Sequence, residues 1–246
     1  MAKPYGRKTK LEVGTILAEK DRATAFEKLA RIPDEQLVGH LFSYFYNMDP
    51  LIKFRSASAM GSLVARMAEQ NMERARIVLR RIMWNLNDES GGIGWGSPEA
   101  MGEILALSPE LALEFKSILF SYLDPGGNFI EHEILQQGVL WGIGTYLEAH
   151  PRDLNEKTRA MLYCYLHSED PIKRAYAFRA LGYARSFLCC LVPDPIRTDD
   201  RRVNLFNGWD FSEIRISDLA KSNDGEKILP DKSCGMLIET FPRKMG

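Results

Sequence analysis

The sequence predicts an all-α fold: an α-solenoid of about four helical hairpins, with an N-terminal capping helix and a short C-terminal tail that contains a β-hairpin. Two observations predict it. Gly61, Gly102, Gly142 and Gly182 recur at intervals of 41, 40 and 40 residues, and the residue before each glycine is apolar. An internal period of about 40 residues is typical of arrays of paired helices that bury their apolar faces by stacking.

The segments around these glycines align as equivalent second helices of four repeats. The position seven residues before each glycine is apolar, holding Phe54, Trp95, Leu135 and Ala175. The positions six and three before it and one after it are mixed or polar, and these offsets share one stripe of a helix. We expect this stripe to form the floor of a concave groove. It comprises Arg55, Ser58, Ser62, Gly96, Glu99, Glu103, Gln136, Val139, Ile143, Tyr176, Arg179 and Tyr183.

The individual elements follow in order. Residues 1–10 are basic and expected to be mobile, and the solenoid is expected to span residues 11–190, beginning with a capping helix over 11–30. The paired helices are predicted over 34–47 and 50–68, 72–86 and 97–107, 109–122 and 129–149, and 154–166 and 171–185. Asp49-Pro50, Ser97-Pro98 and Asp170-Pro171 are helix-start signals, in which a capping side chain precedes a proline suited to the first turn.

Residues 191–246 have a different pattern. Val-Pro-Asp-Pro at 192–195 ends the helical periodicity, and alternating apolar residues around Asn207-Gly208 predict a small hairpin. About 55 residues are too few for a comfortable independent core. We therefore expect this tail to pack on the last repeat and to cap it.

Composition restricts the function classes. Residues 82–151 contain ten acids and one base, a net charge of −9 within a chain of net charge −1. This acidic centre makes nucleic-acid binding unfavourable there and favours a partner of basic character. The four cysteines form no CxxC pair, no apolar run reaches membrane-spanning length, and the N-terminus lacks an export signal, so we expect a cytoplasmic protein with reduced thiols.

The second helices resemble HEAT-like repeats of the bilin-lyase type over residues 33–186. More narrowly, three segments resemble a family of small HEAT-repeat proteins from anaerobic sulfate-reducing bacteria. These segments are Trp84 to Leu105, Glu131 to Gly144 and Asp199 to Trp209. The resemblance implies the fold and no reaction.

Two other resemblances give weaker support for a function. Glu131-His132-Glu133 is similar to the His-Glu pairs of HEAT-repeat di-iron hydroxylases, but the positions equivalent to His132 hold Leu51, Gly92 and Ile172, so no metal or other cofactor is predicted. A resemblance to HEAT-like DNA glycosylases would depend on the tryptophans as aromatic residues of a DNA-binding groove. Trp141, however, lies in an apolar column and is expected in the core.

The candidate binding residues lie in the groove and at one edge of the array. The loop 87–96 either binds a ligand or is a capped excursion whose glycines permit left-handed turns. Glu99 and Glu103 are four residues apart and form a possible anchor for a cation. The predicted binding residues are Asp88, Glu89, Trp95, Glu99, Glu103, Glu131, His132, Gln136, Arg55 and Arg179.

Two functions follow from these residues. The favoured one is a non-enzymatic scaffold that binds a protein or peptide of basic character through the acidic central groove and the 87–96 loop. The alternative is an enzyme or small-molecule site in the same groove, lyase-like or glycosylase-like, with Glu99 as acid or base. A third hypothesis, nucleic-acid binding by the basic residues 1–10, is the least favoured.

Overall fold

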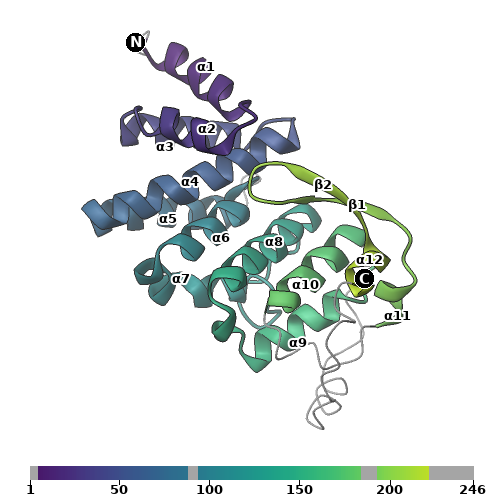
Figure 1. The fold of residues 1–246 in the computed structure, drawn as a ribbon. Helices are drawn as coiled ribbons and strands as arrows, with labels where there is room; N and C mark the ends of the chain where they lie inside the picture. The colour runs from purple at the N-terminus through teal and green to yellow at the C-terminus, as the bar shows by residue number, and fades with distance from the viewer. Residues whose placement is uncertain (1–4, 88–93, 184–192, 222–246) are drawn as a thin grey trace. The chain divides into compact units, whose positions relative to one another are not determined.

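The computed structural model describes residues 5–87, 94–183 and 193–221. It is all-α with one small two-stranded sheet among these residues, so the predicted fold class is confirmed (Figure 1). The chain divides into two compact units. Unit 1 contains residues 1–119 and 206–211, and unit 2 contains residues 120–205 and 212–246. None of the helices in the described residues combines the length and apolarity that a membrane crossing requires.

Unit 1 begins with two helices where the sequence predicted a single capping helix. The break between them is fixed by Asp21, whose carboxylate accepts a hydrogen bond from the backbone N–H of Thr24 and caps the second helix. The first helix starts at Tyr5, six residues before the start at residue 11 that the sequence predicted for the capping helix. The helices are α1 (Tyr5–Leu17), α2 (Arg22–Leu29), α3 (Asp34–Tyr44), α4 (Pro50–Gln70), α5 (Met72–Leu86), α6 (Ser97–Leu107) and α7 (Pro109–Ser121).

The core of unit 1 lies between the second helices of the first two repeats. Helix α4 packs most extensively on α6, and both contact α5. Helix α4 starts as predicted, because Asp49 Oδ1 accepts from the N–H of Leu51 and Pro50 occupies the first turn. Helix α6 starts differently: its cap is Gly96, with φ of 72°, and Ser97 makes no capping hydrogen bond.

Unit 2 holds the second helix of the third repeat, the fourth repeat and most of the tail. Its main helix pair is α8 against α10, and α10 also packs on α9 and α12. Asp170 caps α10 through a hydrogen bond from the N–H of Ile172 to Oδ1, as predicted. The elements are α8 (Glu133–Ala149), a 3₁₀ turn (Pro151–Asp153), α9 (Glu156–Tyr165), α10 (Pro171–Tyr183), α11 (Asp194–Arg197), β1 (Arg202–Phe206), β2 (Phe211–Arg215) and α12 (Ile216–Lys221).

The tail forms the predicted hairpin, with Gly208 at φ of 87° in its turn. Helix α12 of the tail contacts α10 of the last repeat. Residues 206–211, at the hairpin tip, belong instead to unit 1. There Phe54 of α4 packs against Phe206 and Phe211, with ring centroids 5.2 and 5.3 Å apart.

The repeating glycines do not share one role. Gly61 allows α4 to approach α6 closely, since an added Cβ would lie 2.6 Å from the Cβ of Glu103. In α8 the close approach is at Gly144, where an added Cβ would meet Arg179 and Ala180 of α10. Among residues 5–87, 94–183 and 193–221, no atom lies within 4 Å of a Cβ built at Gly182. The 40-residue period therefore marks the repeats correctly, although the close contact moves between positions.

Candidate functional site

The carboxylate of Glu99 is buried instead of facing an open groove. Glu99 lies in the first turn of α6 and is 4% exposed. The ammonium of Lys53 on α4 lies 3.8 Å from Glu99 Oε1 and 6.0 Å from the ring centroid of Trp95. Glu99 Oε2 is buried and accepts no hydrogen bond from the described part of the chain. Glu99 thus belongs to a partly enclosed ion pair, and the prediction that it lines an open groove floor is wrong.

Glu103 is covered in the same way, one turn further along α6. It is 8% exposed, and its Cβ and carbonyl carbon lie 2.6 and 3.0 Å from the position of a Cβ added at Gly61. Two helices this close leave no room for a ligand between them at this level. The residues that were predicted to form the floor of a groove therefore lie largely in the contact between helices.

Arg55 is an internal structural residue, contrary to its predicted binding role. Its Nε donates to the carbonyl oxygen of Trp209 at 2.7 Å, and its Nη1 donates to the carbonyl oxygens of Leu17 and Glu19 at 2.9 Å. Its guanidinium also lies 4.9 Å from the Trp209 ring centroid. Burial lowers the pKa of this guanidinium. With its donors committed to three carbonyls, Arg55 cannot recognise a partner without opening the fold.

Gln136 is likewise used inside unit 2. Its Nε2 donates to the carbonyl oxygen of Ile130 at 2.7 Å, and its Oε1 accepts from the Lys173 ammonium at 2.6 Å. Lys173 is buried and forms a second contact with the carboxylate of Glu133. These bonds fix the start of α8 against α10, so the binding role predicted for Gln136 is replaced by a structural one.

Arg179 spans a short aromatic surface in unit 2. Its guanidinium carbon lies 5.3 Å from the ring centroid of Trp141 and 5.2 Å from that of Tyr183. Its Nη2 is 3.2 Å from a carboxylate oxygen of Glu148. Trp141 itself is 2% exposed, which confirms the prediction that it packs in the core.

The remaining predicted residues are exposed or lie outside the described residues. Glu131 and His132 are exposed ahead of α8, and His132 occupies the cap position without a side-chain capping bond. Asp88 and Glu89 fall within residues 88–93, outside the described part of the chain. In the described ranges, no three His, Cys, Asp or Glu side chains are grouped to hold a metal ion.

One thiol is described. Cys164 is a free, half-buried cysteine, and burial raises its pKa. A raised pKa keeps the thiol protonated and unreactive near neutral pH. Cys189, Cys190 and Cys234 lie outside the described residues.

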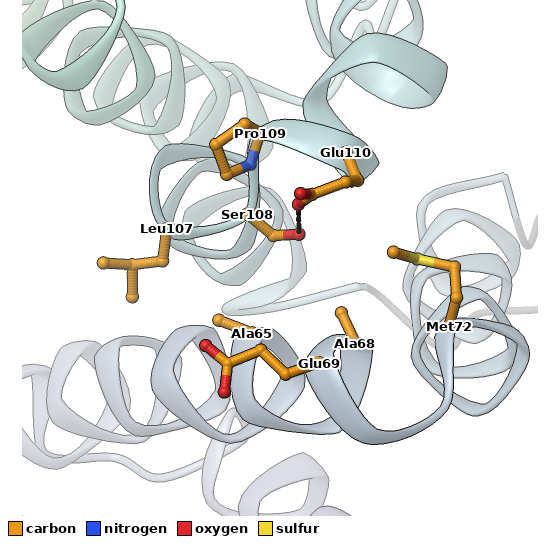
Figure 2. A pocket seen from close by; sticks show the side chains of 8 residues that line it. All are labelled: Ala65, Ala68, Glu69, Met72, Leu107, Ser108, Pro109 and Glu110. Atoms are coloured by element: carbon orange, nitrogen blue, oxygen red, sulfur yellow. Dashed lines mark hydrogen bonds between the residues drawn. The ribbon is translucent and has the colours of Figure 1, made fainter.

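Unit 1 contains a pocket of about 410 Å³ that the glycine alignment did not reveal (Figure 2). It forms where the end of α4 and the start of α5 face the junction of α6 and α7. Figure 2 shows the α4 side chains on one side of the hollow and those of the α6–α7 junction on the other. The lining residues are Ala65, Ala68, Glu69, Met72, Leu107, Ser108, Pro109 and Glu110.

The pocket combines apolar side chains with a hydroxyl and two carboxylates. Glu110 is exposed, and one of its oxygens lies 3.4 Å from the hydroxyl of Ser108. Glu69 is exposed and forms no ion pair with the rest of the described chain. Leu107 is exposed beside them although it is a large apolar residue. An apolar hollow with acids at its edge suits an aliphatic stem that ends in a cation.

Comparisons with known proteins identify similar chains but no family. No protein-family model matches the chain. An uncharacterised protein of Archaeoglobus fulgidus is 28% identical over 183 residues, which cover 73% of this chain and 91% of the relative. The name of this relative states no ligand, reaction or partner.

Three solved structures similar to this chain are designed or engineered proteins. Two engineered proteins are each 16% identical with a TM-score of 0.40; they cover 72% and 71% of this chain and 80% and 47% of their own. A designed armadillo repeat protein is 12% identical with a TM-score of 0.41, covering 86% of this chain and 97% of its own.

Sequence reasoning missed Lys53 and the pocket for different reasons. Lys53 is eight residues before Gly61, outside the aligned columns, and its long side chain reaches Glu99 on the next repeat. A lysine in one repeat and a glutamate within its reach in the next repeat could have indicated this ion pair from the sequence. No comparable sequence signal indicated the pocket, because Glu69 and Glu110 lie at helix ends, where the repeats are irregular.

Proposed function

We propose that this chain is a non-catalytic scaffold of HEAT-type helical repeats that binds a protein segment of basic character. The observation that carries the proposal is the pocket of unit 1, which is lined by both apolar side chains and carboxylates. The proposed contacts are therefore Glu69 and Glu110, in place of the buried Glu99 and Glu103.

The pocket matches a lysine or arginine side chain better than a purely polar or purely apolar group. The methylene stem would cover Ala65, Ala68 and Leu107, and the cationic head would reach Glu69 or Glu110. Charge-assisted hydrogen bonds are stronger than neutral ones, and the flanking apolar lining would reduce their screening by water. Such a contact gives specificity and a fast association rate more than high affinity.

Binding of fluorescently labelled peptides that carry one central Lys or Arg between leucines tests the proposal. We expect Glu69→Lys with Glu110→Lys to weaken binding at least about tenfold, because the partner's cation then meets like charges. The control is Glu12→Lys with Glu27→Lys, two exposed acids elsewhere in unit 1, which changes net charge equally. Equal losses in both double variants would indicate general electrostatic attraction and contradict a specific pocket.

The alternative is a small-molecule site at Glu99, enzymatic or not, of the lyase-like or glycosylase-like kind. One observation favours it: Glu99 Oε2 is buried without a hydrogen bond, beside the Lys53 ammonium. A buried acceptor without a partner is costly, and a bound donor group would satisfy it. A thermal-shift screen of small amines and amides would support this site if a compound stabilises the wild type and not Glu99→Gln. A screen without such a compound would count against it.

A further inference from the structure

The outer surface of α5 carries large apolar side chains where a solvent-exposed stripe is ordinarily polar. Ile77 and Trp84 are 57% and 74% exposed. They are seven residues apart, with Arg80 and Arg81 between them, so all four lie on one side of the helix. The opposite side of α5 is already buried through Ala75, Val78, Leu79, Ile82 and Leu86. The exposed stripe is therefore not needed to hold α5 in the fold.

The apolar surface continues onto α7. Arg76 of α5 forms a two-point ion pair with Glu114 of α7, at 2.8 and 2.6 Å. Leu113, next to Glu114 in the chain, is 77% exposed. Single exposed apolar residues are common on protein surfaces, but two on one stripe of α5, with a third on the helix joined to it, are exposure of the kind that marks an interaction site.

The charge beside this patch is positive. Arg80 pairs with Glu73, which also contacts Arg76. Arg81 is exposed and has no carboxylate partner among the described residues; its guanidinium lies 4.0 Å from the ring centroid of Phe42. Stacking on the ring holds the guanidinium in place while leaving its N–H donors available. An exposed tryptophan beside a pre-positioned arginine is the composition typical of binding hot spots.

We propose that the surface formed by Ile77, Arg80, Arg81, Trp84 and Leu113 binds an acidic segment of a partner protein that also carries apolar side chains. The apolar side chains of that segment would cover Ile77, Trp84 and Leu113, and its carboxylates would pair with Arg80 and Arg81. A second copy of this chain fits poorly, because a twofold contact through α5 would bring the arginines of both copies together. This site is independent of the acidic pocket, so the chain would join two partners of opposite charge.

Selection from a random peptide library displayed on phage, against the intact chain, tests the surface. We expect enriched sequences to contain Asp or Glu together with aromatic or aliphatic residues. A synthetic peptide of an enriched sequence should shift the fluorescence of exposed Trp84 to shorter wavelength. Trp84→Ser and Arg81→Glu should each weaken its binding at least about tenfold, as expected for hot-spot residues.

Two matched controls separate this site from general effects on unit 1. Leu11 on α1 is exposed like Trp84, and Arg22 stacks on Phe26 as Arg81 does on Phe42. Leu11→Ser and Arg22→Glu should change peptide affinity less than about twofold, and circular dichroism melts should show that all four variants fold. These results would support the surface whether or not the acidic pocket binds a basic segment.

Four outcomes would overturn the inference. Enrichment of basic peptides, or equal affinity for wild type and Trp84→Ser, would exclude an acidic segment at this surface. Binding to vesicles with 20% phosphatidylserine that Trp84→Ser abolishes, without any acidic peptide selected, would assign the surface to membranes. Concentration-dependent dimerisation lost in Trp84→Ser would assign it to a second copy of the chain.

Discussion

At the scale of single residues, the second helices of the repeats bury charged side chains with internal partners. Arg55 in α4 donates to three backbone carbonyls, and Lys173 and Arg174 in α10 contact Gln136 and Asp199. Removing one member of such a set leaves its partner buried without compensation. These residues therefore specify how neighbouring segments dock, and they are unavailable to ligands.

Asp199 gives this arrangement a measurable pH dependence. Burial acts to raise the pKa of its carboxyl, but hydrogen bonds from Arg201 and Arg174 outweigh burial and lower it to about 2. A folded pKa below the unfolded value of about 3.9 corresponds to roughly 2 kcal/mol of stability. That stability is complete above about pH 5 and is lost as pH falls toward 2.

We therefore expect Asp199→Asn to lower the free energy of unfolding by about 2 kcal/mol at pH 7. Urea titrations at pH 7, 4 and 2.5 should show the difference from wild type shrinking as the pH falls. The exposed Asp218, on α12, is the control: Asp218→Asn should change stability by less than about 0.5 kcal/mol. A difference for Asp199→Asn that stays constant with pH would contradict an ionic role.

At the scale of secondary structure, the close approach of α4 and α6 determines which side chains of the central repeat a ligand can reach. Gly61 brings the helices together and buries Glu103, and Glu99 one turn earlier is buried beside Lys53. Two of the acids that give this part of the sequence its negative charge, Glu99 and Glu103, thus lie in the interior. Glu69 at the end of α4 and Glu110 at the start of α7 are exposed, and a ligand can reach them.

Gly61→Ala tests this contact. Alanine favours a helix over glycine by about 1 kcal/mol, but the added Cβ would lie 3.0 Å from the backbone of Glu103 and force the helices apart. We expect a net loss of about 1–2 kcal/mol in chemical denaturation. Gly39→Ala, in α3 with no atom within 4 Å of the added Cβ, should instead gain about 0.5–1 kcal/mol. Stabilisation by both substitutions would show that α4 and α6 can separate freely.

Local signals predicted the helices well and the site poorly, for physical reasons. The bounds of α5 and α6 match the prediction because caps, prolines and periodicity act within a few residues. Glu99 and Glu103 were assigned to a solvated stripe because charge normally indicates exposure. Their burial depends on Lys53 and Gly61, which lie 46 and 42 residues away in the chain. Contacts between residues that far apart in the chain produce no periodic pattern in the sequence.

At the scale of the whole molecule, the C-terminal tail completes the N-terminal unit. The Trp209 ring packs edge-on against Phe26, with centroids 5.4 Å apart, and its Nε1 donates to the carbonyl oxygen of Glu19 at 2.9 Å. Together with the bonds of Arg55, this holds the connection between α1 and α2 in place. The stability of unit 1 therefore depends on residues more than 80 positions beyond its main segment.

Trp209→Ala should lower the stability of unit 1 by about 3–5 kcal/mol, because a buried aromatic side chain and a hydrogen bond are lost. Hydrogen exchange should quicken in α1, α2 and α4. Trp84→Ala is the matched control, since that indole is exposed and its loss should cost less than about 0.5 kcal/mol. Unchanged exchange in α1 and α2 after Trp209→Ala would show that the tail is dispensable there.

The return of residues 206–211 to unit 1 also has a consequence for biosynthesis. A ribosome that has made residue 119 must add 92 more amino acids before Phe211 exists. At elongation rates of about 5–20 residues per second, that delay is on the order of 5–20 s. During this time the nascent chain presents Phe54 and Arg55 without their final covering, so chaperones have a defined interval in which to engage it.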